Sequence, residues 1–210
     1  MATRGYIEGR KRYERPQGII WSNNAGTISE GLYVPQGAEI GANPTGIQAG
    51  ELNQFLILSD HNRGEINISQ KRIEERKRTI NGRMRSYHIA DKINLSWNWT
   101  NLPSRAYSEF ANFNSSGASP SKRTQDEYTA DGGAGGVEIV EWYENHKGSF
   151  WMFLAYDKYT NFPNNNDQFT HLNKYNQIVE VYFSDFNYSV TKRGGSNHDL
   201  WNISVSLEEV

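Results

Sequence analysis

QKRIEERKRTINGRMRSYHIADKINLSWNWTNLPSR, residues 70–105, is the stretch of sequence that decides the fold. At its centre Asn81-Gly82 is a strong β-hairpin signal, because a type I′ turn needs positive φ at both of its central residues. We therefore expect residues 70–80 and 83–100 to form the two strands of a hairpin. The second strand alternates apolar with polar residues, and its apolar positions are Ile93, Leu95, Trp97 and Trp99.

The rest of the chain predicts more strands and one helix. Short buried strands are expected at 55–58 and 149–157, and a long strand at 178–192 turns back into the alternating strand 199–210. The alternation of the long strand slips by one residue at Ser184-Asp185, which indicates a β-bulge.

One helix is expected in the stretch VEIVEWYENHK, residues 137–147. Its apolar residues recur at helical spacing, and Gly148 follows as a candidate C-cap. We therefore predict a mainly β protein: a β-sandwich or small β-barrel core with one flanking α-helix and long loops.

The chain divides into two parts by composition. Residues 1–18 are charged and punctuated by glycine, and residues 22–50 are rich in Gly, Asn and Pro with only isolated apolar residues. We therefore interpret residues 1–50 as an irregular N-terminal arm and loop for assembly contacts. Disorder is the alternative interpretation. Residues 51–210 are interpreted as a single β-rich domain with a long loop at 112–136.

Composition excludes several classes of function. The 210 residues carry a net charge of −2, which gives no whole-chain attraction to nucleic acid or to an anionic membrane. No apolar run approaches the roughly 20 residues of a membrane helix, and the basic start lacks the apolar core of a secretory signal. The chain has no cysteine, which excludes thiol catalysis and Cys-ligated metal.

No motif for catalysis is present. The histidines are widely spaced and match no metal-binding pattern: His61, His88, His146, His171 and His198. Asp131-Gly-Gly-Ala-Gly-Gly resembles a phosphate loop but lacks the lysine and follows a polar stretch, so we interpret it as a flexible loop. We expect no enzyme activity, no cofactor and no metal.

The basic run in the hairpin has three interpretations. Seven cations fall within residues 71–85, interrupted by Glu74 and Glu75. These interpretations are contact with nucleic acid, salt bridges between subunits, and an ordinary solvated sheet face. Arginine pairs bidentately with carboxylates, which favours the contact between subunits.

The same stretch resembles structural tail proteins of tailed bacteriophages. The succession Arg-Ile-Glu, a basic stretch, Asn-Gly, Met-Arg-Ser-Tyr, Ala-Asp-Lys, the Ser/Trp strand and Leu-Pro-Ser carries the resemblance, and GVEIVEWYENHKGSFWMFLAYD is similar in style. The resemblance covers roughly residues 55–210. It implies a β-sandwich or small barrel repeated around a ring, commonly six-fold, and stacked into a tube through which the genome passes. Lumens in this family tend to be acidic, so a basic hairpin argues against placing residues 71–85 there.

From these observations we predict a non-enzymatic subunit of the virion tail, made in the host cytoplasm. Its partners would be itself, in a hexameric stacked ring, other tail or baseplate proteins, and DNA passing through the lumen. A distal-tail, baseplate or minor tail protein is the alternative within this class. The candidate contacts between subunits are Arg72, Arg76, Arg78, Arg83, Arg85, Tyr33 and Tyr128.

Two other classes remain as competitors. A carbohydrate-binding β-sandwich would use exposed Trp97, Trp99, Trp142 and Trp151 to stack on sugars, although the alternation places the first pair in a core. An enzyme with a histidine and carboxylate site is the third class.

Overall fold

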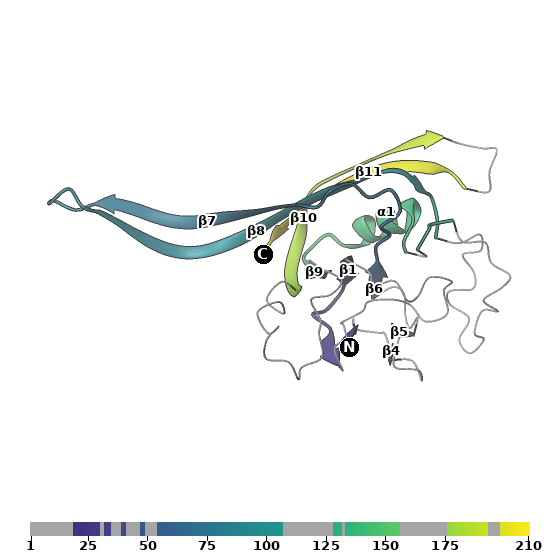
Figure 1. The fold of residues 1–210 in the computed structure, drawn as a ribbon, viewed down its shortest axis with the longest axis horizontal. Coiled ribbons are helices and arrows are strands. Elements are labelled where there is room, and N and C mark those ends of the chain that lie inside the picture. Colours follow the sequence, from purple (N-terminus) through teal and green to yellow (C-terminus); the bar gives the residue numbers. More distant parts are fainter. Residues whose placement is uncertain are drawn as a thin grey trace.

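The computed structural model shows a body with one long arm projecting from it (Figure 1). The structure describes residues 19–29, 32–34, 39–40, 47–48, 54–106, 128–131, 133–155, 176–192 and 198–210. The main sheet and its helix are β1 (Ile19–Ser22), β6 (Phe55–Ile57), β7 (Asn67–Arg78), β8 (Met84–Pro103), α1 (Gly136–Asn145), β9 (Phe150–Ala155), β10 (Asn176–Lys192) and β11 (Leu200–Glu209). Two small ribbons pair β2 (Thr27–Ser29) with β3 (Leu32–Val34), and β4 (Glu39–Ile40) with β5 (Ile47–Gln48).

Seven strands form one antiparallel sheet in the order β6-β1-β9-β10-β11-β8-β7. The mainly β class with one flanking helix is therefore confirmed. Every neighbouring pair in this sheet is antiparallel, so hairpins and short loops can connect it and one face can meet water.

The sheet curls around its core as an incomplete barrel. The rings of Trp21 on β1 and Trp97 on β8 lie 6.2 Å apart, although three strands separate β1 from β8 in the sheet. Side chains so distant along a flat sheet could not meet, because neighbouring strands are about 4.8 Å apart. The ring centroid of Trp21 also lies 6.3 Å from that of Trp142 on α1 and 5.4 Å from that of Phe150 on β9. One aromatic cluster therefore fills the concave side of the sheet.

The chain itself links the two edges of the sheet. Residues 58–66 run from edge strand β6 to edge strand β7, and on the way they bond to β8. The Gly64 N–H donates to the Asn98 carbonyl at 2.7 Å, and Arg63 forms an isolated bridge with Trp99. Asn62 supplies the turn with a positive φ of 53°.

Strand β1 corrects our interpretation of residues 1–50 as irregular. Ile19, Ile20 and Trp21 are buried, and β1 lies inside the sheet between β6 and β9. The strand was missed because all four of its residues are buried, so they show no apolar-polar alternation. Residues 1–18 lie outside the described part of the chain, and their proposed role in assembly remains a prediction.

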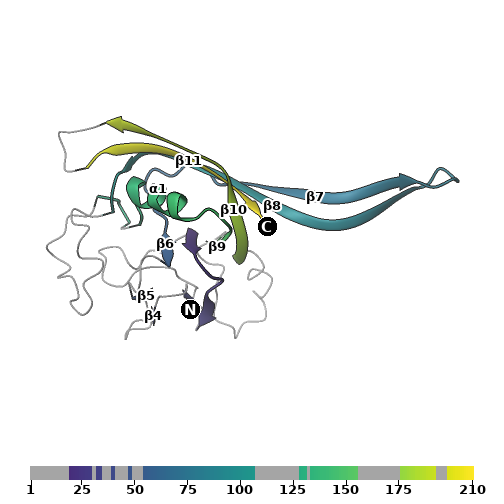
Figure 2. The ribbon, with the colours of Figure 1, turned by 180° about the vertical axis from the view of Figure 1, so that it is seen from behind.

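Helix α1 occupies the predicted segment but ends differently. The Glu138 carboxylate accepts from the Gly135 N–H at 2.5 Å, which satisfies one free donor at the N-terminus. The expected C-cap, Gly148, is wrong: the helix ends at Asn145, and His146 donates its backbone N–H to the Trp142 carbonyl at 3.0 Å. The helix lies against the concave side of the sheet, as both views show (Figures 1 and 2).

The C-terminal hairpin follows the sequence prediction closely. Strands β10 and β11 pair along most of their length, and the register shifts between Phe183 and Asp185, so the predicted bulge at Ser184-Asp185 is confirmed. On β11 the alternating residues Ile203, Val205 and Leu207 are buried.

Candidate interaction surface

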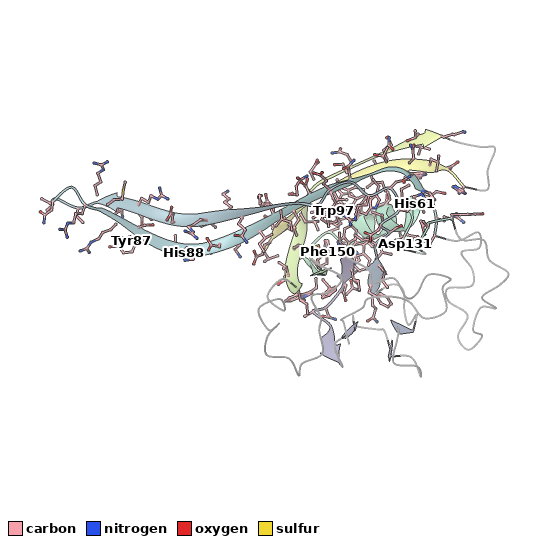
Figure 3. All side chains as sticks on the ribbon, viewed as in Figure 1. His61, Tyr87, His88, Trp97, Asp131 and Phe150 are labelled. Atoms are coloured by element: carbon pink, nitrogen blue, oxygen red, sulfur yellow. The ribbon has the colours of Figure 1, made fainter. Side chains whose placement is uncertain are left out.

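The arm is the part of the β7–β8 hairpin that extends beyond the rest of the sheet. Pairing of β8 with β11 ends at Asn94, so residues 84–93 of β8 have only β7 as a neighbour. Ten residues at about 3.3 Å each make the arm roughly 30 Å long. Almost every side chain on it is exposed, and Tyr87 and His88 stand along it in Figure 3. We call residues 70–77 and 86–93 the shaft, and residues 78–85 the tip.

The tip contains the predicted Asn81-Gly82 turn in a different form. Gly82 has a positive φ of 73°, whereas the φ of Asn81 is not positive. The Gly82 N–H donates to the Thr79 carbonyl at 2.8 Å, and the Thr79 N–H donates to the Arg83 carbonyl at 2.8 Å. The hairpin is confirmed and the type I′ turn is wrong. This is a three-residue loop with glycine in the left-handed region.

One face of the shaft holds a network centred on Asp91. Arg72 lies opposite Asp91, and its Nε donates to the carboxylate at 3.0 Å. The His88 Nε2 lies 3.2 Å from the same carboxylate oxygen. These hydrogen bonds, that of Arg72 first, lower the pKa of Asp91 below its usual value, and the Asp91 carboxylate raises the pKa of Arg72.

The network continues along the same face toward the tip. Glu74 accepts from the Ser86 hydroxyl at 2.5 Å and forms a salt bridge with Arg76. The bond from Ser86, followed by that from Arg76, lowers the pKa of Glu74. Two of the predicted contact residues, Arg72 and Arg76, are therefore paired within their own arm.

The opposite face of the shaft is mixed apolar and basic. Ile73 and Tyr87 are exposed there, and a salt bridge of 2.7 Å joins Lys77 to Glu75. Lys92 donates to the carbonyl oxygen of Val210, which ties the base of the arm to the end of β11.

Within the arm, the cations that form no salt bridge are concentrated at the tip. The tip residues Arg78, Arg83 and Arg85 form no salt bridge with any residue that the structure describes. On the shaft the same is true of Lys71. Two apolar side chains lie among the tip arginines: Ile80 is fully exposed at 105% and Met84 is 58% exposed. The sequence analysis missed these two; an isoleucine immediately before Asn-Gly, where turns are normally polar, was the available signal.

The arm and the rest of the chain carry opposite charges. Residues 71–85 have seven cations and two carboxylates, a net charge of +5. Since the whole chain carries −2, the remaining residues carry −7. This separation of charge distinguishes the arm from the rest of the chain.

The two predicted tyrosine contacts belong to segments other than the β7–β8 arm. Tyr33 belongs to the short strand β3. Tyr128 is half-buried, its ring contacts the tilted ring of His198 with 4.4 Å between centroids, and its backbone N–H donates to the Ala106 carbonyl at 2.9 Å. The contacts that the structure gives Tyr128 are not with the arginines of the arm, and the role of both tyrosines between subunits stays a prediction.

A second polar cluster in the described residues is built around Asp131, the first residue of the glycine-rich stretch, and it holds Asp131 against Ser59 and Asp60. The buried Asp131 carboxylate accepts from the Ser59 hydroxyl at 2.7 Å, the Asp60 N–H at 2.7 Å and the Gly133 N–H at 3.0 Å. A phosphate loop would leave such N–H groups free for an anion, whereas here an internal carboxylate occupies them. Our interpretation of a flexible loop is also wrong for the described part, because Asp131, Gly133 and Ala134 are all buried.

The neighbouring histidine does not complete a catalytic triad. The His61 ring lies beside this cluster (Figure 3), and its Nδ1 accepts from the Ala130 N–H at 2.8 Å. The Ser59 hydroxyl donates to Asp131 and accepts from the His61 backbone N–H at 3.0 Å, so neither bond joins the hydroxyl to the imidazole. Among the described residues no group of three or more His, Asp or Glu side chains is arranged to hold a metal ion. No helix in this part of the chain is long and apolar enough to cross a membrane.

The tryptophans do not form a sugar-binding platform. Trp97, Trp99 and Trp142 are buried in the core, and Trp151 on β9 is half-buried. Three of the four rings proposed for stacking on sugars are thus inaccessible, so the expectation that these tryptophans are exposed in a carbohydrate-binding module is wrong.

Comparisons with known proteins give a distant structural likeness. No protein-family model matches the sequence, and no curated protein matches it. Among solved structures, the chain is similar to one from the tail of an empty GTA particle, obtained by helical refinement with C6 symmetry. That chain is 9% identical, the alignment covers 75% of our chain and 82% of that chain, and the TM-score is 0.36. A likeness at this level carries no inference about the function of our chain.

Proposed function

We propose that this protein is a structural subunit of a phage-type tail that assembles with copies of itself into stacked rings. The rings would be hexameric and form the tail tube of the virion, through which DNA passes, in contact with other tail or baseplate proteins. A distal-tail or baseplate ring is the second candidate, since the same arm would serve it.

The observation that carries this proposal is the arm. An extended two-stranded hairpin is marginally stable in water by itself, and this one extends roughly 30 Å with no core of its own. Such a segment adds contact area to a neighbour without enlarging the body. The mainly β fold and the resemblance of residues 55–210 to tail proteins support the same function.

A second physical argument comes from the sheet edges. Strand β7 is an edge strand, and along the arm β8 also has a free edge. Exposed strand edges invite pairing with another chain, and charged residues on an edge limit such pairing to suitable partners. The lysines and arginines of the arm fit this control of assembly.

The test is self-association of the purified protein over a wide range of concentration. Sedimentation velocity should show a concentration-dependent species of defined mass, and negative-stain electron microscopy should show rings or tubes of uniform diameter. The matched control removes the arm: Gln70 and Ile93 are paired, so an Asn-Gly turn can join them in place of residues 71–92. The armless protein should stay folded and monomeric. A full-length chain that stays monomeric at every concentration would contradict the proposal, and rings formed by the armless protein would show that the arm is not what carries the assembly.

A further inference from the structure

We propose that the tip of the arm, residues 78–85, is the docking element, and that it binds an acidic surface on the body of a second copy of this chain. This inference rests on the proposed function and deepens it, because it names the partner and divides the arm into two roles. The shaft would hold the tip at a distance, and the tip would supply the binding.

The first evidence is the distribution of ion pairs. Arg72, Arg76 and Lys77 on the shaft each have a carboxylate partner in the same arm. A cation already paired gains little from a new partner, because it must give up the old one. Arg78, Arg83 and Arg85 have no such partner in the described residues, so their pairing capacity is available to another molecule.

The second evidence is apolar exposure at the same place. Ile80 at the apex is fully exposed at 105%, and Met84 is 58% exposed. A surface that combines apolar side chains with arginine is typical of the central part of protein interfaces. Duplex DNA would use the arginines but would gain little from Ile80, since phosphate contacts dominate such binding.

The charge separation identifies the partner. The tip belongs to the +5 segment, and the remainder of the chain carries −7, so the excess of acidic residues in a second copy lies outside its own basic segment. On α1, for example, Glu141 and Glu144 are exposed and form no salt bridge in the described part of the chain. Complementary charge gives specificity and faster encounter between the two surfaces.

The same charges determine the geometry of assembly. Two tips repel each other, so tip-to-tip contact is unfavourable and the tip must meet a different patch, on the body of the other copy. Such a contact can close reciprocally between two copies across a two-fold axis. In the stacked rings of the proposed function it is instead heterologous, and heterologous contacts generate rings or open filaments.

The experiment compares two double variants with equal charge changes. Arg83→Gln/Arg85→Gln removes two tip cations, and Arg72→Gln/Arg76→Gln removes two shaft cations. The concentration at half-assembly is measured by sedimentation velocity, and circular dichroism confirms the fold of each protein. The tip variant should raise this concentration about tenfold or more, and the shaft variant less than about threefold. A second pair, Ile80→Ser against Ile73→Ser, should show the same ranking for the apolar residues.

Each outcome separates the two levels of the proposal. A wild-type protein that assembles, with tip and shaft variants affected equally or not at all, would overturn the role of the tip and leave the tail function standing. A wild-type protein that never self-associates would overturn both. Tip-dependent binding to duplex DNA or to anionic lipid vesicles, without any effect of the tip on self-association, would also overturn the proposed partner.

Discussion

His61 is the residue whose protonation should be most visible in the stability of the fold. Its Nδ1 accepts the Ala130 N–H at 2.8 Å, which requires that nitrogen to be unprotonated. Burial lowers the pKa of His61 from 6.5; the charge of Asp131 opposes this effect, and His198 adds to it. Burial also lowers the pKa of His146, which directly follows α1.

These lowered pKa values fix the sign of the pH dependence. Between the folded pKa and 6.5 the unfolded chain binds more protons than the folded chain, so the free energy of unfolding falls as the pH falls through this window. Above 6.5 the contribution is fully present. Urea midpoints measured from about pH 7.5 down to about pH 5.5 should therefore decrease.

The matched control for this prediction is His61→Asn. The asparagine Oδ1 can accept the Ala130 N–H but does not titrate. Its urea midpoint should depend less on pH than that of the wild type, with His146 responsible for part of the remainder. An identical pH dependence of both proteins would show that His61 is not the titrating group.

Gly133 provides a second test at the residue scale, independent of pH. A Cβ at this position would lie 2.6 Å from the Ser59 Cα and 2.7 Å from its backbone nitrogen, distances that force the backbone to move. Gly133→Ala should lower the free energy of unfolding by about 1–3 kcal/mol, as overpacked sites do. Gly148→Ala is the control, because a Cβ there meets nothing within 4 Å. Equal thermal midpoints for the two variants would show that the glycine-rich stretch is not closely packed.

At the scale of elements, the arm should open more readily than the strands of the body. Its residues bury almost no apolar side chain, whereas β9 carries the buried residues Phe150, Met152 and Leu154. Segments with few buried contacts open with low free energies. Hydrogen-exchange mass spectrometry of the unassembled protein should therefore show fast exchange in residues 70–93 and slow exchange in 150–155. Equal protection of the two segments would contradict this picture.

The elements also show which sequence signals were sufficient. The β7–β8 hairpin, the C-terminal hairpin and its bulge at Ser184-Asp185 were predictable, since alternation and Asn-Gly turns depend on neighbouring residues. The turn type was not predictable, because Asn-Gly also occurs in loops where only the glycine has positive φ. Strand β1 was missed because its pairing with β6 and β9 is set by residues distant in sequence.

Of the candidate site, the sequence could predict only that a basic run lies in the hairpin. Sequence marked the basic run but could not separate paired from unpaired cations, because the pairs depend on register. A register shift between Ile73 and Glu74 places Glu74 opposite His88, and the Asp91 that pairs with Arg72 lies outside the run. The packing role of the Asp131 stretch was hidden for a similar reason: its partners Ser59 and Asp60 are about seventy residues away.

At the scale of the whole molecule, the placement of β1 changes how the N-terminal region must be tested for assembly. Removing residues 1–50 would delete Ile19, Ile20 and Trp21 and so destroy the core, which makes loss of assembly uninformative. A truncation that ends before Ile19 keeps β1 whole and separates assembly from folding.

The charge separation between arm and body leads to a prediction about ionic strength. If the +5 segment of one copy meets the −7 remainder of another, added salt screens the attraction. The Debye length falls from about 10 Å at 0.1 M to about 3 Å at 1 M. The concentration at half-assembly should therefore rise by about tenfold between 0.05 M and 0.5 M NaCl, measured by sedimentation velocity.

The tip variants separate the charged part of this contact from its apolar part. Arg83→Gln/Arg85→Gln should weaken assembly at low salt and flatten the dependence on salt, because fewer charges remain to be screened. Ile80→Ser should weaken assembly by a similar factor at every salt concentration, since burial of an apolar side chain is not screened. Assembly that strengthens as salt is added would mean that apolar burial alone drives the contact, and the unpaired arginines of the tip would then need another partner.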